Sequence, residues 1–207
     1  MDEEFSKAIS SIKNKEWSFL VKDFFNEEVP EYFEEEQASS TGKYHPELAS
    51  QKGGLLRHTI GALEIAESKM SGMKKVQFDD KLKDEVRIAI LVHDAFKFGT
   101  QERYDKETKE KGKCYTVINH GTIAAKKFFE FAKDIIAFID LRRICVAIEC
   151  HMGAFEDRSN RAFPIIGPED EDVVYFTQIA DFLISLRNMP KSIKAENMYR
   201  KHLEAKG

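Results

Sequence analysis

Residues 88–97 read IAILVHDAFK, an apolar run that ends in a histidine, an aspartate and a lysine. The first half of this run is apolar on every side of a helix, so we expect the helix over 80–97 to be the most deeply buried of the chain. His93 and Asp94 follow Ile90 by three and four residues, which places both on the inward face. This stretch therefore predicts ionisable groups inside a helical core.

The rest of the chain is also helical in pattern, because no period-2 alternation is long enough to predict a sheet. We expect helices at 4–24, 54–71, 80–97, 120–132, 141–152 and 170–188, and a polar amphipathic one up to Gly207. Segments rich in polar residues, Gly or Pro predict loops at 37–52, 99–113 and 155–168. The prediction is an all-α protein with one helical bundle over 1–207, with a core at 44–189, an N-terminal helical appendage at 1–36 and a C-terminal helix at 190–207.

Six His and Asp residues recur with about one helix and one connection between successive members, apart from one adjacent pair. They are His58, His93, Asp94, His120, His151 and Asp181. Each falls on a predicted helix, so successive helices of a bundle can project them into a common centre. Asp181 lies in the apolar stretch IADFLI, where a lone carboxylate costs several kcal/mol unless a cation or strong hydrogen bonds stabilise it.

This donor set predicts a divalent metal. Imidazole and carboxylate without thiolate suit Mn²⁺, Fe²⁺, Co²⁺, Ni²⁺ or Zn²⁺ and disfavour Ca²⁺. Two ions fit the number of ligands better than one. The first would be held by His58, His93, Asp94 and Asp181, and the second oxygen of Asp94 would bridge to an ion held by His120 and His151. The alternative is one ion with the last two histidines hydrogen-bonded around it.

Composition excludes several classes of protein. The chain has 207 residues, 32 basic and 36 acidic side chains and a formal net charge of −4, so extended nucleic-acid binding is not expected. No apolar run approaches the ~20 residues that span a bilayer. The acidic N-terminus and three cysteines without CxxC spacing predict a cytoplasmic protein. A homo-oligomer is compatible with the sequence.

The six residues stand in the order H…HD…H…H…D, and at this point the chain resembles the HD-domain phosphohydrolase superfamily over residues 44–189. The resemblance implies an all-α fold and a dinuclear metal centre. Gly53 to Thr59, GGLLRHT, is similar to the family's segment around its first ligand. Lys97 stands at the lysine of the HDxxK pattern, which implies a phosphate contact. Tyr44-His45-Pro46 resembles a subset that includes the HD module of bacterial 3′–5′ exoribonucleases.

These observations predict a metal-dependent phosphohydrolase that cleaves a phosphoester or phosphodiester of a small nucleotide-like substrate through a metal-activated hydroxide. Asp94 and Lys97 are the predicted catalytic residues. The predicted substrate-binding residues are Lys97, Arg57, His45, Arg158 and Arg161, although each of the last four also has an ordinary surface or turn interpretation. The alternatives are a short-oligonucleotide exonuclease, a di-iron oxygenase on the same ligands, and a non-catalytic nucleotide-binding module.

Overall fold

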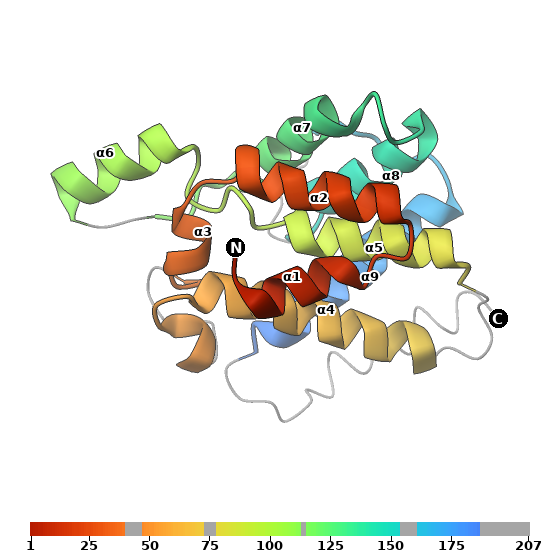
Figure 1. The fold of residues 1–207 in the computed structure, drawn as a ribbon, viewed down its shortest axis with the longest axis horizontal. Coiled ribbons are helices and arrows are strands. Elements are labelled where there is room, and N and C mark those ends of the chain that lie inside the picture. The colour runs from red at the N-terminus through yellow and green to blue at the C-terminus, as the bar shows by residue number, and fades with distance from the viewer. Residues whose placement is uncertain (40–46, 73–77, 113–114, 154–160, 187–207) are drawn as a thin grey trace.

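The computed structural model describes residues 1–39, 47–72, 78–112, 115–153 and 161–186. These residues form helices and no strand, which confirms the all-α prediction (Figure 1). In chain order the helices are α1 (Glu3–Ser10), α2 (Lys15–Glu27), α3 (Tyr32–Glu35), the 3₁₀ turn η1 (Glu47–Ser50), α4 (Gly54–Gly72), α5 (Asp80–Val92), α6 (Gln101–Lys111), α7 (His120–Ala132), α8 (Phe138–Glu149) and α9 (Pro168–Ile184). The predicted C-terminal helix at 190–207 lies outside the described residues.

Helix α5 forms the centre of the bundle and packs against α4, α8 and α9. Residues 88–92 of α5 are each at most 1% exposed, so this run is deeply buried as expected. It is not the most buried run of the chain, because residues 144–148 of α8 are each 0% exposed. Among the described helices, none is long and apolar enough to span a membrane.

Buried ion pairs join α5, α8 and α9 near their N-terminal ends. Arg143 on α8 donates to both carboxylate oxygens of Glu85 on α5, at 2.7 and 2.9 Å. Arg142 donates through two N–H groups to Asp170 on α9, each at 2.7 Å. On each of these helices the predicted ligand follows the ion-pair residue by about 8 to 11 positions, which is roughly 12–16 Å along a helix. The three helices thus run in one direction, from the ion pairs toward His93, His151 and Asp181.

The prediction of one helix over 4–24 is wrong, because the chain breaks at 11–14 between α1 and α2. The carboxylate of Asp84, on α5, accepts hydrogen bonds from the backbone N–H groups of Lys13 and Asn14 at 2.9 and 2.8 Å. The side chain of Asn14 in turn accepts from the N–H of Trp17 at 3.2 Å and caps α2. A partner distant in sequence therefore stabilises the break.

The prediction of a loop over 99–113 is also wrong, because most of this segment is α6. The Thr100 hydroxyl caps its first turn by accepting from the N–H of Arg103, and Gly112 ends it in the left-handed conformation at φ 63°. Side-chain pairs four residues apart, such as Arg103 with Glu107, stabilise its surface. Helix α6 buries no residue and projects from the body of the protein (Figure 1), so it has no apolar stripe that periodicity could detect.

The N-terminal helices share the hydrophobic core of the bundle. Phe24 on α2 is fully buried, and its ring meets Phe96 at 6.3 Å and Phe128 of α7 at 5.1 Å in edge-on contacts. Phe96 follows Asp94 by two residues, so α2 packs directly behind the segment that carries the predicted site.

Replacing Phe24 with Ala should lower the free energy of unfolding by about 3–5 kcal/mol, because it leaves a cavity at this aromatic contact. Phe19→Ala is the matched control on the same helix, since the Phe19 side chain is 66% exposed, and it should change stability by less than about 0.5 kcal/mol. Urea unfolding followed by circular dichroism measures both. Equal losses in the two variants would contradict this packing.

Candidate metal centre

Two of the predicted helices end before their ligands. Helix α5 ends at Val92, so His93 and Asp94 lie in the turn that follows it rather than within a helix over 80–97. Tight i to i+3 hydrogen bonds hold this turn, from the N–H of Ala95 to Val92 O and from the N–H of Lys97 to Asp94 O, both at 3.0 Å. Helix α8 likewise ends at Glu149, and His151 lies in the turn beyond it.

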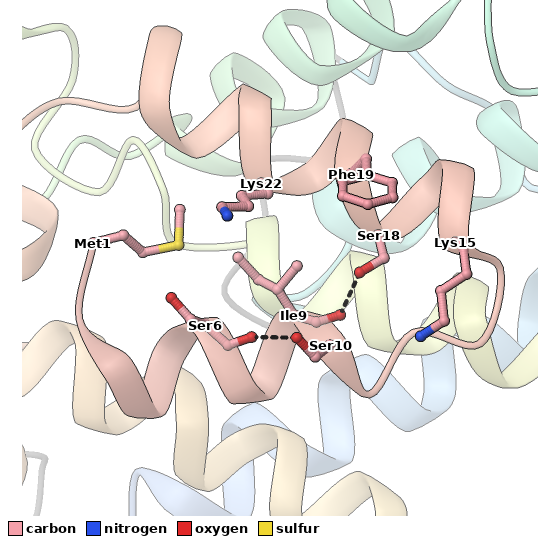
Figure 2. A pocket seen from close by; sticks show the side chains of 8 residues that line it. All are labelled: Met1, Ser6, Ile9, Ser10, Lys15, Ser18, Phe19 and Lys22. Atoms are coloured by element: carbon pink, nitrogen blue, oxygen red, sulfur yellow. Dashed lines mark hydrogen bonds between the residues drawn. The ribbon is translucent and has the colours of Figure 1, made fainter.

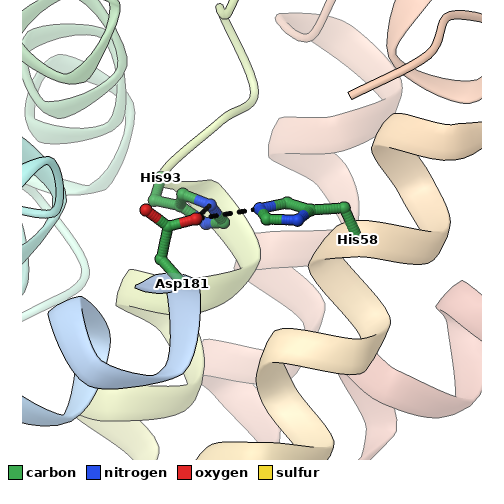
Figure 3. Close-up of side chains that lie close together, drawn as sticks. All are labelled: His58, His93 and Asp181. Atoms are coloured by element: carbon green, nitrogen blue, oxygen red, sulfur yellow. Dashed lines mark hydrogen bonds and ion pairs between the residues drawn. The ribbon is translucent and has the colours of Figure 1, made fainter. Parts of the chain in front are cut away.

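The first group of ligands comes from three elements (Figure 3). His58 on α4, His93 after α5 and Asp181 on α9 bring one ligand atom each to within 4.8 Å of one another. The Nε2 atom of His58 lies 3.0 Å from Asp181 Oδ1, and Nε2 of His93 lies 3.7 Å from the same oxygen. We call this group, with Oδ2 of Asp94, the first position.

The carboxylate of Asp94 lies between two pairs of histidines. Its Oδ2 atom is 3.6 Å from Nε2 of His58 and 3.5 Å from Nε2 of His93. Its Oδ1 atom is 3.0 Å from Nε2 of His120 and 3.6 Å from Nε2 of His151. Each oxygen therefore faces a different pair, which is the arrangement that a bridging carboxylate requires.

His120, His151 and Oδ1 of Asp94 form what we call the second position. His120 is the first residue of α7, and its Nε2 atom lies 3.0 Å from Nε2 of His151. Two imidazole nitrogens bound to one ion at about 2.1 Å lie about 3 Å apart when they are cis, so this pair can share an ion.

Backbone carbonyls orient three of the four imidazoles. Nδ1 of His93 faces Ile90 O at 2.6 Å, Nδ1 of His120 faces Val117 O at 2.6 Å, and Nδ1 of His151 faces Ile148 O at 2.8 Å. A carbonyl oxygen only accepts, so Nδ1 carries a proton in each ring. Nε2 is left to bind a metal, as in known metal sites where a carbonyl fixes the ring.

Burial and charge set the protonation of the centre. The four histidines and Asp94 are at most 2% exposed, whereas the Asp181 side chain is 16% exposed, so the centre meets solvent on the side of Asp181. Burial alone would raise the pKa of Asp94, but Lys97 and His93 beside it hold that pKa well below its usual range. Burial likewise opposes ionisation of Asp181, but the hydrogen bond with His58 and the nearby imidazole of His93 keep its pKa well below the usual range.

The histidines differ in charge. Burial, with the neighbouring charge of His120, lowers the pKa of His151 to about 3. Burial also lowers the pKa of His58. Burial acts in the same direction on His93, but Asp94 and Asp181 outweigh it and raise its pKa to about 10. Without a metal, the carboxylates of Asp94 and Asp181 thus favour a protonated, positively charged His93. A metal ion bound beside His93 would supply that positive charge instead.

The residues present fit a divalent ion. Among the described residues, the buried Nε2 of His93 has no hydrogen-bond partner, although two carboxylate oxygens lie within 3.7 Å of it. Such an orphaned nitrogen is unusual unless it serves a ligand. Neutral imidazole nitrogens and ionised carboxylates are the forms that bind Mn²⁺, Fe²⁺, Co²⁺, Ni²⁺ or Zn²⁺.

Of the predicted substrate residues, Lys97 contacts a residue of this centre. Lys97 is buried, and its Nζ atom donates to Oδ2 of Asp94 at 2.5 Å. The Arg57 guanidinium donates to the carbonyl of Lys52 at 2.6 Å, beside the turn that precedes α4. Arg161 is half-buried and lies within the predicted loop at 155–168. His45 and Arg158 lie outside the described residues.

Sequence reasoning missed one residue that ties the ligand-bearing helices together. Gln178 on α9 donates through Nε2 to the carbonyl of Cys150 at 2.7 Å. This bond joins the turn that carries His151 to the helix that carries Asp181. Its spacing could have identified it in the sequence, because Gln178 precedes Asp181 by three residues and so lies on the same face of the helix.

A separate hollow lies between α1 and α2 (Figure 2). It is lined by Met1, Ser6, Ile9, Ser10, Lys15, Ser18, Phe19 and Lys22. Its three hydroxyls already donate to backbone carbonyls, as Ser18 does to Ile9 O at 3.1 Å. This lining offers no imidazole or carboxylate, so the hollow is not a second metal site of the same chemistry.

Comparison with family models decides the family. Residues 55–200 match the model of the HD domain. The chain belongs to the HD-domain family. This confirms the family expected from the sequence, whose superfamily consists in general of metal-dependent hydrolases. All six predicted ligands lie within the matched residues. The comparison with curated proteins finds no match, and neither does the comparison with solved structures.

Metal should stabilise the fold. An ion that binds only the folded protein raises the free energy of unfolding by about 2.7 kcal/mol when its concentration is about 100 times Kd. We expect Mn²⁺ to raise the Tm of the metal-free protein by about 5–10 °C in a thermal unfolding scan. Asp181→Ala should lose most of this rise. Asp80→Ala, at an exposed carboxylate of α5, should keep it. A rise of equal size in Asp181→Ala would argue against the first position.

Proposed function

We propose that this protein is a phosphohydrolase that cleaves a phosphoester or phosphodiester of a small nucleotide-like substrate at a centre of two divalent ions. The observation that carries this proposal is the carboxylate of Asp94, whose two oxygens face opposite pairs of histidines at 3.0–3.6 Å. Membership of a family of metal-dependent hydrolases supports the same reaction class.

The ligand sets follow from the two positions. His58, His93, Asp181 and Oδ2 of Asp94 would hold one ion, and His120, His151 and Oδ1 of Asp94 the other. When bound, two such ions supply an activated water at neutral pH and charge stabilisation for the phosphoryl oxygens. Asp94 keeps both positions at a fixed separation, and the carbonyl-held imidazoles keep their Nε2 atoms directed at the centre.

Lys97 supplies a second kind of contact. Its buried ammonium group lies 2.5 Å from Asp94 Oδ2, so it already faces the centre. With the two positions occupied, the Lys97 ammonium would be able to donate to a phosphate oxygen and so stabilise the negative charge that grows during the reaction. Arg57 and Arg161, together with His45 and Arg158, are proposed to bind the rest of the substrate.

The net charge of −4 favours a short substrate over a polymer. A polymer that is bound along a surface needs many cationic contacts to its phosphates. A small phosphoester needs few such contacts, which the ions, Lys97 and the other proposed substrate residues would supply. We therefore propose a small molecule as the partner in solution, with a short oligonucleotide as the alternative substrate.

Purified protein tests this function directly. Elemental analysis identifies the bound metals, and a panel of phosphomonoesters, phosphodiesters and nucleotides with added Mn²⁺ identifies the reaction. Cleavage of a member of the panel supports the proposal. Oxygen consumption by the iron-loaded protein without phosphoester cleavage would favour a di-iron oxygenase, and tight nucleotide binding without turnover would favour a binding module.

Asp94→Ala should abolish turnover and lower the metal content below about one ion per chain, because it removes a ligand of both positions. Asp80→Ala is the control and should keep the metal content and the activity of the wild type. Metal analysis after gel filtration and the assay of the best substrate measure these effects. Turnover like that of the wild type in Asp94→Ala would refute the site.

Lys97→Ala should lower kcat by about 100–1000-fold, which is the typical cost of losing one donor to a transition-state oxyanion. Its metal content should stay at the wild-type level. Lys109→Ala, an exposed lysine of α6, is the matched control and should retain full activity. If Lys97→Ala lost metal and activity together, Lys97 would hold Asp94 in place and make no phosphate contact of its own.

A further inference from the structure

Gly121 lies where the start of α7 touches the end of α8. A Cβ atom at this position would lie 3.0 Å from Ile148 O, 3.1 Å from Glu149 O and 3.1 Å from Cε1 of His151. Such distances are shorter than side chains normally accept, so a methyl group here would push the two helix ends apart by a few tenths of an ångström.

One of these three contacts is with a residue of the second position, His151, and another, Ile148 O, holds the ring of that residue. Cε1 of His151 is bonded to the Nε2 atom that faces Asp94 Oδ1. Ile148 O accepts the hydrogen bond from Nδ1 of His151, at 2.8 Å, that sets the orientation of this ring. His120 is the residue directly before Gly121, and its Nε2 atom lies 3.0 Å from Nε2 of His151. The close approach at Gly121 thus fixes the distance between the two imidazoles.

The neighbouring residues tie the same two helix ends together. The Thr122 hydroxyl on α7 donates to the carboxylate of Glu149, the last residue of α8, at 2.9 Å. The same carboxylate accepts from the backbone N–H groups of Ala162 and Phe163. The first position is built from α4, α9 and the turn after α5, and none of the three atoms closest to the added Cβ belongs to those elements.

We infer that Gly121 is a positioning residue that allows the second ion to bind, so that its missing side chain decides whether the centre holds two ions or one. This inference rests on the proposed two-ion centre. Loss of ring alignment by a residue that touches no ion typically weakens metal binding by about 10–100-fold.

The test compares the wild type, Gly121→Ala and Gly72→Ala. Gly72, at the end of α4, is the matched control because a Cβ there meets no atom within 4 Å. Each metal-free protein is titrated with Mn²⁺ by calorimetry, bound ions are counted after equilibrium dialysis, and electron paramagnetic resonance detects the coupled pair of ions. Circular dichroism and Tm report the fold.

We expect two ions per chain in the wild type and in Gly72→Ala. In Gly121→Ala we expect the first ion to bind within about twofold of the wild-type Kd, the second ion about 10–100-fold more weakly, and the coupled signal to be lost. The helix content should be retained.

Other outcomes would contradict either the role of Gly121 or the two-ion centre itself. Two ions of unchanged affinity in Gly121→Ala, beside two in the wild type, would overturn the role of Gly121 alone. Fewer than two ions in the wild type would overturn the two-ion centre and this inference with it. An unfolded Gly121→Ala, or equal weakening of both ions, would show that Gly121 serves the whole bundle and would also overturn the inference.

Discussion

The carboxylate of Asp94 is the constraint on which the rest of the structure depends. It is fully buried and ionised, and four imidazoles and one ammonium group surround its two oxygens. A carboxylate in such a place is costly unless cations compensate it. The helices around it must therefore converge closely enough for histidines from α4, α7 and the turns after α5 and α8 to reach it, which fixes how the bundle packs at this end.

The opposite end of the bundle supports this convergence. Arg142 and Arg143 link α8 to Asp170 and Glu85, so that α5, α8 and α9 start from a common set of ion pairs and run in one direction. Their C-terminal ends then meet at the centre. Helix C-termini carry partial negative charge, so this direction favours cations where the ligands gather. The arrangement makes a positive centre possible in a protein with a net charge of −4.

Local pattern predicted much of this fold, and its failures have physical causes. The inward positions of the six His and Asp residues and the buried run of α5 were predictable because these residues fall on the apolar faces of the expected helices. Helix α6 was missed because caps and side-chain pairs stabilise it, and Tyr104, which packs against the core, is too little to give it an apolar stripe. The break between α1 and α2 was missed because the carboxylate that holds it, Asp84, lies about 70 residues further along the chain.

The sequence by itself determined the helical class, the family and the identity of the six predicted ligands, because helical period and residue type are local properties. Only the tertiary structure decided how Asp94 divides its oxygens between two pairs of histidines, that His93 and His151 lie in turns beyond their helices, and that Lys97 faces Asp94. The same holds for Gly121, since the contact that requires a glycine there exists only when α7 and α8 meet. Distances between helices depend on packing across the whole core, and no stretch of sequence contains them.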